Sequence, residues 1–274
     1  MSHQEHLGRS EVATDTLHAA SLAHMAATLD RAEVPETLPP LWHWMLFTSW
    51  VRPAELGPDG HPARGKFLPA DPELPRRMYA GGRLSFPGTL RAGDVATRKS
   101  VITRVEEKEG STGRLLFVTV RHEISGRAGL ALTEEHDIVY RGLAGAAAKP
   151  GAPFADPPGA FQRTVTPDPV LLFRYSALTG NGHRIHYDRS YATGVEGYPG
   201  LIVHGPLQAT LLAELAQRHA PGRKLARFSF RAVRPVFDLD PFRLVGHWHG
   251  VSQVQLAVVD HGGQLCMRAE AEFE

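Results

Sequence analysis

The chain has 274 residues, of which 42% are hydrophobic, so it can bury a sizeable core in one large domain or two modest ones. Its 30 basic and 29 acidic side chains nearly balance, which gives no electrostatic footprint for nucleic acid or an anionic membrane. The single cysteine, Cys266, excludes an intramolecular disulfide and a cysteine metal cluster.

The sequence shows no membrane or export signal. No apolar run approaches the roughly 20 residues that a spanning helix needs. The first residues include Glu5, Glu11 and Asp15, without the basic and then apolar layout of a signal peptide. We therefore expect a cytoplasmic protein whose partners are small molecules or proteins.

The first part of the chain predicts a helix followed by a long loop. Residues 1 to about 10 are polar and have nothing to bury, so we expect a frayed tail. A helix capped by Asp15 or Thr16 should follow. The apolar run at 41–47 is expected in the core, and the proline- and glycine-rich stretch to about Pro75 predicts a long functional or mobile loop.

Three strand-length runs come next, at 95–107, 114–124 and 130–140, and they predict a β-meander. Residues 142–160 are rich in glycine, alanine and proline, which is typical of a linker. The sequence therefore predicts two units, at 11–141 and 161–274.

The second unit combines helices and strands. Helices are expected near 170–178 and from Gly205 to His219, where leucines recur at helical spacing. Strands are expected at 226–232, 242–249, 253–259 and 264–273. Between the helices lies a polar loop with Asn181, His183 and His186.

An internal echo relates the two units. Arg83-Leu84-Ser85-Phe86 recurs as Arg227-Phe228-Ser229-Phe230, and the strands that follow correspond as well. We interpret this echo as a tandem duplication. The first unit has no counterpart of the Gly205 helix or of the polar loop, so we expect the chemistry in the second unit and a shape-giving role for the first.

The polar loop carries a resemblance to a known family. The runs Tyr175-Ser176-Ala177-Leu178-Thr179-Gly180-Asn181-Gly182-His183-Arg184-Ile185-His186-Tyr187-Asp188 and Ile202-Val203-His204-Gly205 resemble the hydratase-2 motif of MaoC-like hotdog proteins. Within that superfamily the chain looks closest to the double-hotdog branch of type 2 hydroxyacyl-thioester dehydratases and of mesaconyl-C4-CoA or itaconyl-CoA hydratases. The likeness extends to Trp42-His43-Trp44, to residues 55–62 and to residues 76–83 in the first unit.

This resemblance implies an α+β tandem (double) hotdog, with antiparallel sheets wrapped on a central helix. It also implies a hydro-lyase that adds or removes water across the C2–C3 double bond of a short-chain, dicarboxylic 2-enoyl-CoA. The alternative within the family is a 3-hydroxyacyl dehydratase of fatty acid synthesis, acting on a carrier protein or on CoA. A hotdog thioesterase and a non-catalytic thioester-binding module are rival functions.

The same resemblance assigns catalytic roles. His186 matches the catalytic histidine, and Gly205 opens the central helix with an N–H that can bind the thioester oxygen. The partner aspartate of the family is replaced by Asn181, which can orient a water but cannot accept its proton. Either His186 makes both proton transfers, which we favour, or a second group such as His183 or Glu196 assists.

Candidate substrate-binding residues surround this site. Arg184, with Arg174 and Arg189, flanks the loop and could meet the phosphates of CoA or an acidic carrier protein. In the first unit Arg76, Arg77 or Arg83 could bind a distal substrate carboxylate beside Tyr79. The alternative is that these arginines bind no substrate and form a solvated basic edge of the protein. We expect no cofactor and no metal, because the histidine pairs at 183/186 and 247/249 lack an obvious carboxylate or cysteine partner. A homodimer is expected from hotdog behaviour in general.

Overall fold

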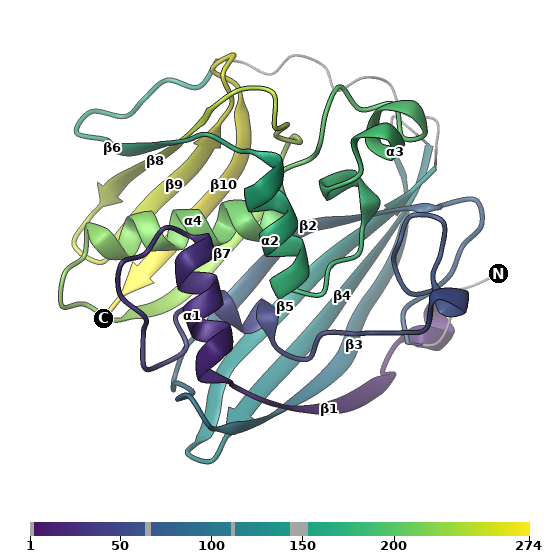
Figure 1. Cartoon of the computed structure of the whole chain (residues 1–274), viewed down its shortest axis with the longest axis horizontal. Helices are drawn as coiled ribbons and strands as arrows, with labels where there is room; N and C mark the ends of the chain where they lie inside the picture. Colours follow the sequence, from purple (N-terminus) through teal and green to yellow (C-terminus); the bar gives the residue numbers. More distant parts are fainter. Residues whose placement is uncertain (1–2, 64–66, 111–112, 143–152) are drawn as a thin grey trace.

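The computed structural model describes residues 3–63, 67–110, 113–142 and 153–274, and their strands form one ten-stranded antiparallel sheet (Figure 1). The strands are β1 (Ser10–Thr16), β2 (Arg76–Ser85), β3 (Val95–Gly110), β4 (Gly113–Gly126), β5 (Gly129–Arg141), β6 (Phe161–Val165), β7 (Leu225–Ala232), β8 (Phe242–His249), β9 (Gln253–Val259) and β10 (Leu265–Phe273). The α-helices are α1 (Ala19–Thr28), α2 (Pro169–Leu178), α3 (Arg189–Gly194) and α4 (Gly205–Arg218). Four short 3₁₀ turns are η1 (His3–His6), η2 (Trp42–Met45), η3 (Pro53–Glu55) and η4 (Arg184–His186).

The strand order is symmetric about the middle of the sheet. It runs β1-β3-β4-β5-β2-β7-β10-β9-β8-β6, so the second half repeats the first, outward from the β2–β7 pair. The two predicted sheets are thus joined edge to edge, which leaves neither β2 nor β7 as an open edge. The large antiparallel sheet with few helices agrees with the predicted double-hotdog fold.

The sequence echo lies at this joint. Leu84 faces Phe228 and Ser85 faces Arg227 across the β2–β7 pair. Arg83 binds Glu135 and Asp137 of β5, while the equivalent Arg227 binds Glu272 of β10. Equivalent residues therefore make equivalent ion pairs on the two sides of the joint, as a duplicated chain would.

The helices lie on one face of the sheet (Figure 1), where α4 packs on β7 to β10 and α1 packs against α2. Four leucines of α4 recur at helical spacing, are at most 3% exposed, and each contribute about 1.5–3 kcal/mol by burial; they are Leu207, Leu211, Leu212 and Leu215. Pro206 has no backbone N–H, and it is tolerated in the first turn because a donor there would have no intrahelical acceptor. The predicted bounds of α4 are confirmed to within one residue.

The first half lacks a counterpart of α4, as predicted. α1 follows β1 as α2 follows β6, but the described residues between α1 and β2 contain only the turns η2 and η3. Trp42 of η2 is fully buried, in a cluster that also contains Leu132 and Leu212, so the two halves share one core. The prediction that the run 41–47 belongs to the core is confirmed.

The predicted cap of α1 is wrong. Asp15 and Thr16 lie in β1, which pairs with β3, and the helix begins at Ala19. The Asp15 carboxylate accepts instead from the N–H groups of Thr16 and Phe47, at 2.7 Å each. Polar residues such as Asp15 and Thr16 can lie in an edge strand as well as at the start of a helix. Here they lie in a strand because β1 pairs with β3.

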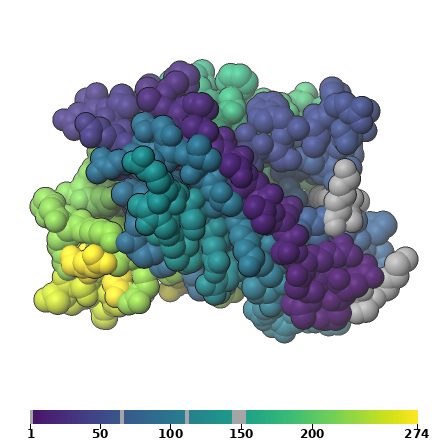
Figure 2. Space-filling model, turned by 90° about the horizontal axis from the view of Figure 1, so that it is seen from below, coloured from purple at the N-terminus to yellow at the C-terminus, as the bar shows by residue number. Residues whose placement is uncertain are grey.

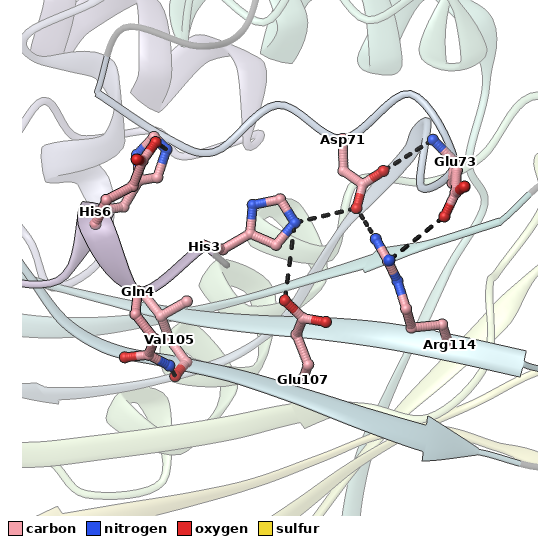
Figure 3. A network of polar contacts seen from close by, with 9 residues as sticks. His3, Gln4, His6, Asp71, Glu73, Val105, Glu107 and Arg114 are labelled. Atoms are coloured by element: carbon pink, nitrogen blue, oxygen red, sulfur yellow. Dashed lines mark hydrogen bonds and ion pairs between the residues drawn. The ribbon is translucent and has the colours of Figure 1, made fainter. Parts of the chain in front are cut away.

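The predicted frayed tail is also wrong. His3 and His6 are 8% and 5% exposed in η1, and Figure 2 shows the segment running on along β1 against the sheet. His3 Nε2 lies 3.1 Å from an oxygen of Asp71, and the Gln4 amide donates to the carbonyl of Val105 (Figure 3). Polar side chains can be buried when they have hydrogen-bonding partners. The polar composition of this segment therefore did not imply that it is frayed.

The remaining predicted elements are largely confirmed, with extended ends. The meander at 95–140 corresponds to β3, β4 and β5, and the four strands at 226–273 correspond to β7 to β10. The sequence patterns gave no signal for β1 or β6. Most of the predicted linker 142–160 lies outside the described residues, which resume at residue 153.

Candidate active site

The polar loop runs from the end of α2 to the start of α3. α2 is capped by Asp168, whose carboxylate accepts from the N–H groups of Val170 and Leu171. After α2 the side-chain oxygen of Asn181 accepts from the backbone N–H of His183 at 3.0 Å, which folds the chain into a tight turn. The next residues form η4 and place His186 inside the protein.

His186 is held as a neutral base. It is 7% exposed, and its Nδ1 lies 2.7 Å from the carbonyl oxygen of Ile202. A carbonyl can only accept, so Nδ1 carries the hydrogen and Nε2 keeps the lone pair. Burial lowers the pKa of His186 from 6.5 to about 4, against the opposing effect of this hydrogen bond. At neutral pH, Nε2 is therefore ready to accept a proton.

His204 lies directly against His186. The two rings stack with centroids 3.7 Å apart, and His204 Nε2 is 2.8 Å from the hydroxyl of Ser176 on α2. His204 occupies the N-cap position of α4 without a side-chain capping bond. His204 therefore packs on His186 instead of capping the helix, and that packing ties His186 to the start of α4.

Gly205 is the first residue of α4, next to this stack. Its N–H belongs to the first turn, where backbone donors have no intrahelical acceptor and the helix dipole is positive. A Cβ built on Gly205 would meet nothing closer than the Cε of Met267, at 4.0 Å. Close packing therefore does not require a glycine here, and the side of the helix start stays open.

A loop from the first half reaches this site. The backbone N–H of Arg184 donates to the carbonyl of Asp59 at 2.9 Å. Gly60 has φ +86°, and a Cβ on it would meet the carbonyl oxygen of Gly182 at 2.1 Å, so only glycine allows this approach. The ring of His61 is consequently 4.4 Å from the ring of His183.

Reasoning from the sequence missed Asp59 and His61 as functional residues. Two signals pointed to them: they lie in the predicted long loop, and segment 55–62 carried part of the family resemblance. What the sequence could not give was their distance from a motif more than 100 residues away.

The two candidate replacements for the missing aspartate differ in place. The ring of His183 is 4.4 Å from that of His61, and it is perpendicular to the ring of His186 and 5.6 Å away. Burial, with the nearby imidazoles of His61 and His186, lowers the pKa of His183, so it is neutral at pH 7. Glu196 is bound elsewhere, with its carboxylate 3.3 Å from Arg76 Nε and within reach of the Tyr191 hydroxyl.

The predicted substrate arginines fall into different environments. Arg184 forms an ion pair with Asp188, at 2.7 Å, and lies over the ring of Tyr191. Arg83 is held by two carboxylates of β5, which raise its pKa despite partial burial. Burial lowers the pKa of His183 and of His136, and the positive charge of Arg77 acts on both in the same direction.

Tyr79 belongs to a buried polar cluster that the sequence did not indicate. Its hydroxyl donates to Glu134 at 2.7 Å, and Glu134 also accepts from His43 Nε2 and Trp44 Nε1, at 3.0 Å each. Glu134 is 3% exposed, and although burial opposes it, His43 holds the pKa of this carboxyl well below its usual value. The ring of Tyr79 stacks on Phe230 of β7, so this cluster supports the joint between the two halves.

One group of described residues offers several metal-binding side chains. Asp59, His61 and His183 each present a ligand atom, and the three atoms lie within 4.8 Å of one another. Asp59 and His61 already satisfy each other by hydrogen bonds, and the nearby charge of Arg77 opposes a cation at His183. The sequence prediction that no metal is bound is untested.

Comparison with known proteins places this geometry in a family. A family model for hydroxyacyl-thioester dehydratase type 2 matches residues 41–238. A mesaconyl-C(4)-CoA hydratase from Chloroflexus aurantiacus is 47% identical over 279 residues, which cover 97% of this chain and 96% of the relative. The chain belongs to the hydroxyacyl-thioester dehydratase type 2 family.

Solved structures agree on the fold of this family member. A MaoC-like dehydratase from Phytophthora capsici superposes with a TM-score of 0.70 at 16% identity, over 98% of this chain and 96% of the other. A Mycobacterium tuberculosis protein described as a double hotdog gives a TM-score of 0.55 at 14% identity, over 98% and 96%. The predicted family and fold are thus confirmed. None of the helices in the described residues is long and apolar enough to cross a membrane.

Proposed function

We propose that this protein is a hydro-lyase that adds water to, or removes it from, the C2–C3 bond of a short-chain dicarboxylic enoyl-CoA of the mesaconyl-C4-CoA or itaconyl-CoA type. The near full-length similarity to a mesaconyl-C(4)-CoA hydratase supports this class of reaction. The observation that carries the proposal is the fixed neutral His186, stacked on the residue that precedes the open helix start at Gly205.

The reaction can be written with these groups. Nε2 of His186 takes a proton from a water while the water oxygen bonds to C3. The electrons of the double bond move toward the thioester, whose oxygen accepts a hydrogen bond from the N–H of Gly205. The amide nitrogen of Asn181 orients the water, since its side-chain oxygen is engaged with His183. A second proton must then reach C2.

A positive group is needed for the distal carboxylate of a dicarboxylic substrate, and we assign this role to Arg77. Arg83 and Arg76 are engaged by acidic side chains of β5 and by Glu196, and the positive charge of Arg77 acts on His183 of the polar loop. A guanidinium binds a carboxylate through two parallel hydrogen bonds, which favours this substrate class. Arg184 and Tyr79 would contribute to the site by shaping it.

Two assays test this proposal. Purified protein is offered a panel of enoyl-CoA and 3-hydroxyacyl-CoA thioesters, and the change in enoyl absorbance is followed with His186→Ala beside the parent. We expect turnover by the parent and a loss of about 10²–10⁴-fold in kcat for His186→Ala. A fully active His186→Ala variant would refute the proposed mechanism. A parent protein that binds thioesters without turnover would favour the non-catalytic thioester-binding module.

The substrate class is tested with Arg77→Ala, using Arg83→Ala on the same strand as the matched variant. We expect Arg77→Ala to lose at least tenfold more kcat/KM on itaconyl-CoA than on crotonyl-CoA, because one charged contact is worth about 1.5–3 kcal/mol. Arg83→Ala should affect both substrates equally. Equal losses for Arg77→Ala, with good turnover of long apolar chains, would favour the fatty acid dehydratase.

We also propose that the protein is a cytoplasmic homodimer that acts on CoA rather than on carrier-protein thioesters. The one cysteine, Cys266, is buried and unpaired, which fits a reducing compartment. The dimer is supported by the outer strands β1 and β6, whose open edges are suited to pairing. Light scattering of the purified protein, and turnover of matched CoA and carrier-protein substrates, test these points.

A further inference from the structure

The hydratase site needs two groups that differ in protonation. The attacking water must lose a proton to a base, and C2 must gain one from an acid. His186 supplies the base, because its Nδ1–H is fixed on the carbonyl of Ile202 and its Nε2 is unprotonated. With Asn181 in place of the family's aspartate, the position five residues before His186 carries no titratable side chain.

The loop from the first half brings a carboxylate and an imidazole to this place. Asp59 Oδ1 accepts from the backbone N–H of His61 at 3.0 Å, and Asp59 Oδ2 lies 3.3 Å from His61 Nδ1. Both side chains are partly buried, 19% and 16% exposed, so their attraction is screened less than on a surface. The backbone contacts of Asp59 with Arg184, and of Gly60 with Gly182, hold the pair against the polar loop.

The surroundings of this pair differ from those of His186, because a carboxylate faces its imidazole. Although burial raises it, the hydrogen bond and charge of His61 hold the pKa of Asp59 well below its usual value, so the carboxylate is ionised. An ionised carboxylate on Nδ1 stabilises the imidazolium form of its partner. In the imidazolium form, both ring nitrogens of His61 carry a hydrogen, so Nε2 has a proton to give. Two titratable groups whose environments favour opposite states are the signature of an acid and a base.

We propose that His61, oriented by Asp59, is the general acid that protonates C2 while His186 acts as the general base. This inference rests on the proposed hydratase reaction and adds a catalytic residue from the first half. The C2–C3 π bond breaks, the water oxygen bonds to C3, the water proton passes to His186 Nε2, and C2 takes the proton of His61 Nε2. Asp59 is a positioning residue, and His183, whose ring is near both of the others, offers a route for a proton to return from His186 to His61.

The other candidates are less suited to this role. Glu196 is engaged in an ion pair with Arg76, which also donates to its backbone carbonyl. His183 is neutral, since burial and the positive charges around it disfavour its protonated form. The amide of Asn181 cannot donate a proton to carbon at neutral pH.

The decisive experiment compares His61→Gln and Asp59→Asn with the parent, with His261→Gln as the control at an exposed turn. We expect His61→Gln to lower kcat by about 10²–10³-fold while KM changes less than about threefold. The alkaline limb of the parent's pH–rate profile, where the acid loses its proton, should be absent from His61→Gln. Asp59→Asn should keep that limb but move it to lower pH, because the imidazolium has lost its carboxylate. His261→Gln should match the parent.

Each contrary result has a definite meaning. A kcat of His61→Gln within threefold of the parent, or a loss of the acidic limb instead of the alkaline one, would overturn the role of His61. Activity of the parent that a chelator abolishes would overturn it in favour of a metal ion held by the same cluster. A parent inactive on every enoyl thioester would sink the proposed function itself. Circular dichroism melts of the variants separate misfolding from chemistry, and a folded Asp59→Asn keeps the test valid should His61→Gln not fold.

Discussion

Replacing Gly205 by alanine separates a catalytic glycine from a structural one. The new Cβ would have the Cε of Met267 as its nearest neighbour, at 4.0 Å, which is ordinary van der Waals contact. Alanine is a better helix former than glycine by up to about 1 kcal/mol. The free energy of unfolding of Gly205→Ala should therefore stay level or rise by up to about 1 kcal/mol.

The effect on catalysis should be opposite. The added methyl group stands beside the N–H that the thioester oxygen must reach, so it should keep that oxygen from its donor. Loss of one such donor costs about 10²–10³-fold in kcat, or about 2.7–4 kcal/mol of transition-state stabilisation. KM should change much less, because the oxygen gains most of its charge in the transition state.

The assay combines initial rates, followed by enoyl absorbance, with urea denaturation of the same samples. Gly194→Ala is the matched control, since Gly194 ends α3 and a Cβ there would also meet nothing within 4 Å. A Gly205→Ala variant with kcat within threefold of the parent would refute the N–H as oxyanion donor. A stability loss above about 2 kcal/mol would instead show that the glycine is needed for packing.

Three further predictions concern the stability of the protein and the contact between the loops that contain Gly60 and Gly182. Burial lowers the pKa of His122 from 6.5 to about 4 and that of His136 from 6.5 to about 3, so on acidification the unfolded chain binds protons before the folded one does. The unfolding free energy, measured in urea, should therefore fall as the pH drops from about 6.5 to 4. An equal unfolding free energy at pH 7.5 and pH 5 would contradict this. Glu134→Gln should lower the unfolding free energy at pH 7.5 by about 3 kcal/mol, because Tyr79, His43 and Trp44 lose a buried charged acceptor. A loss under about 1 kcal/mol would argue against a charged acceptor at this position. Gly60→Ala should lower kcat more than tenfold, because the new methyl group would push the two loops apart. Gly93 also has a positive φ, but a Cβ there would meet no atom within 4 Å, so Gly93→Ala should lower stability without lowering kcat.

The local elements and the chemical motif could be predicted from the sequence, because both depend on neighbours along the chain. Leucines at helical spacing and the Pro221-Gly222 stop defined α4, and alternating residues defined β7. His186 was identified as the base from the motif, and the structure adds its tautomer. The errors came where a partner lies far away: β3 pairs with β1 and sets the start of α1, and Asp71 binds His3 of the supposed tail.

The site as a whole depended on tertiary structure. By itself the sequence gave a hydratase motif with its aspartate replaced by Asn181, and it gave Asp59 and His61 only as part of a distant loop. The fold places that loop on the motif, because Gly60 and Gly182 lack the side chains that would keep the two backbones apart. The spacing of residues in the sequence shows which side chains lie close together only when they are a few positions apart. Contacts between residues 59 and 183 arise from packing the two halves on one core, and no local pattern encodes them.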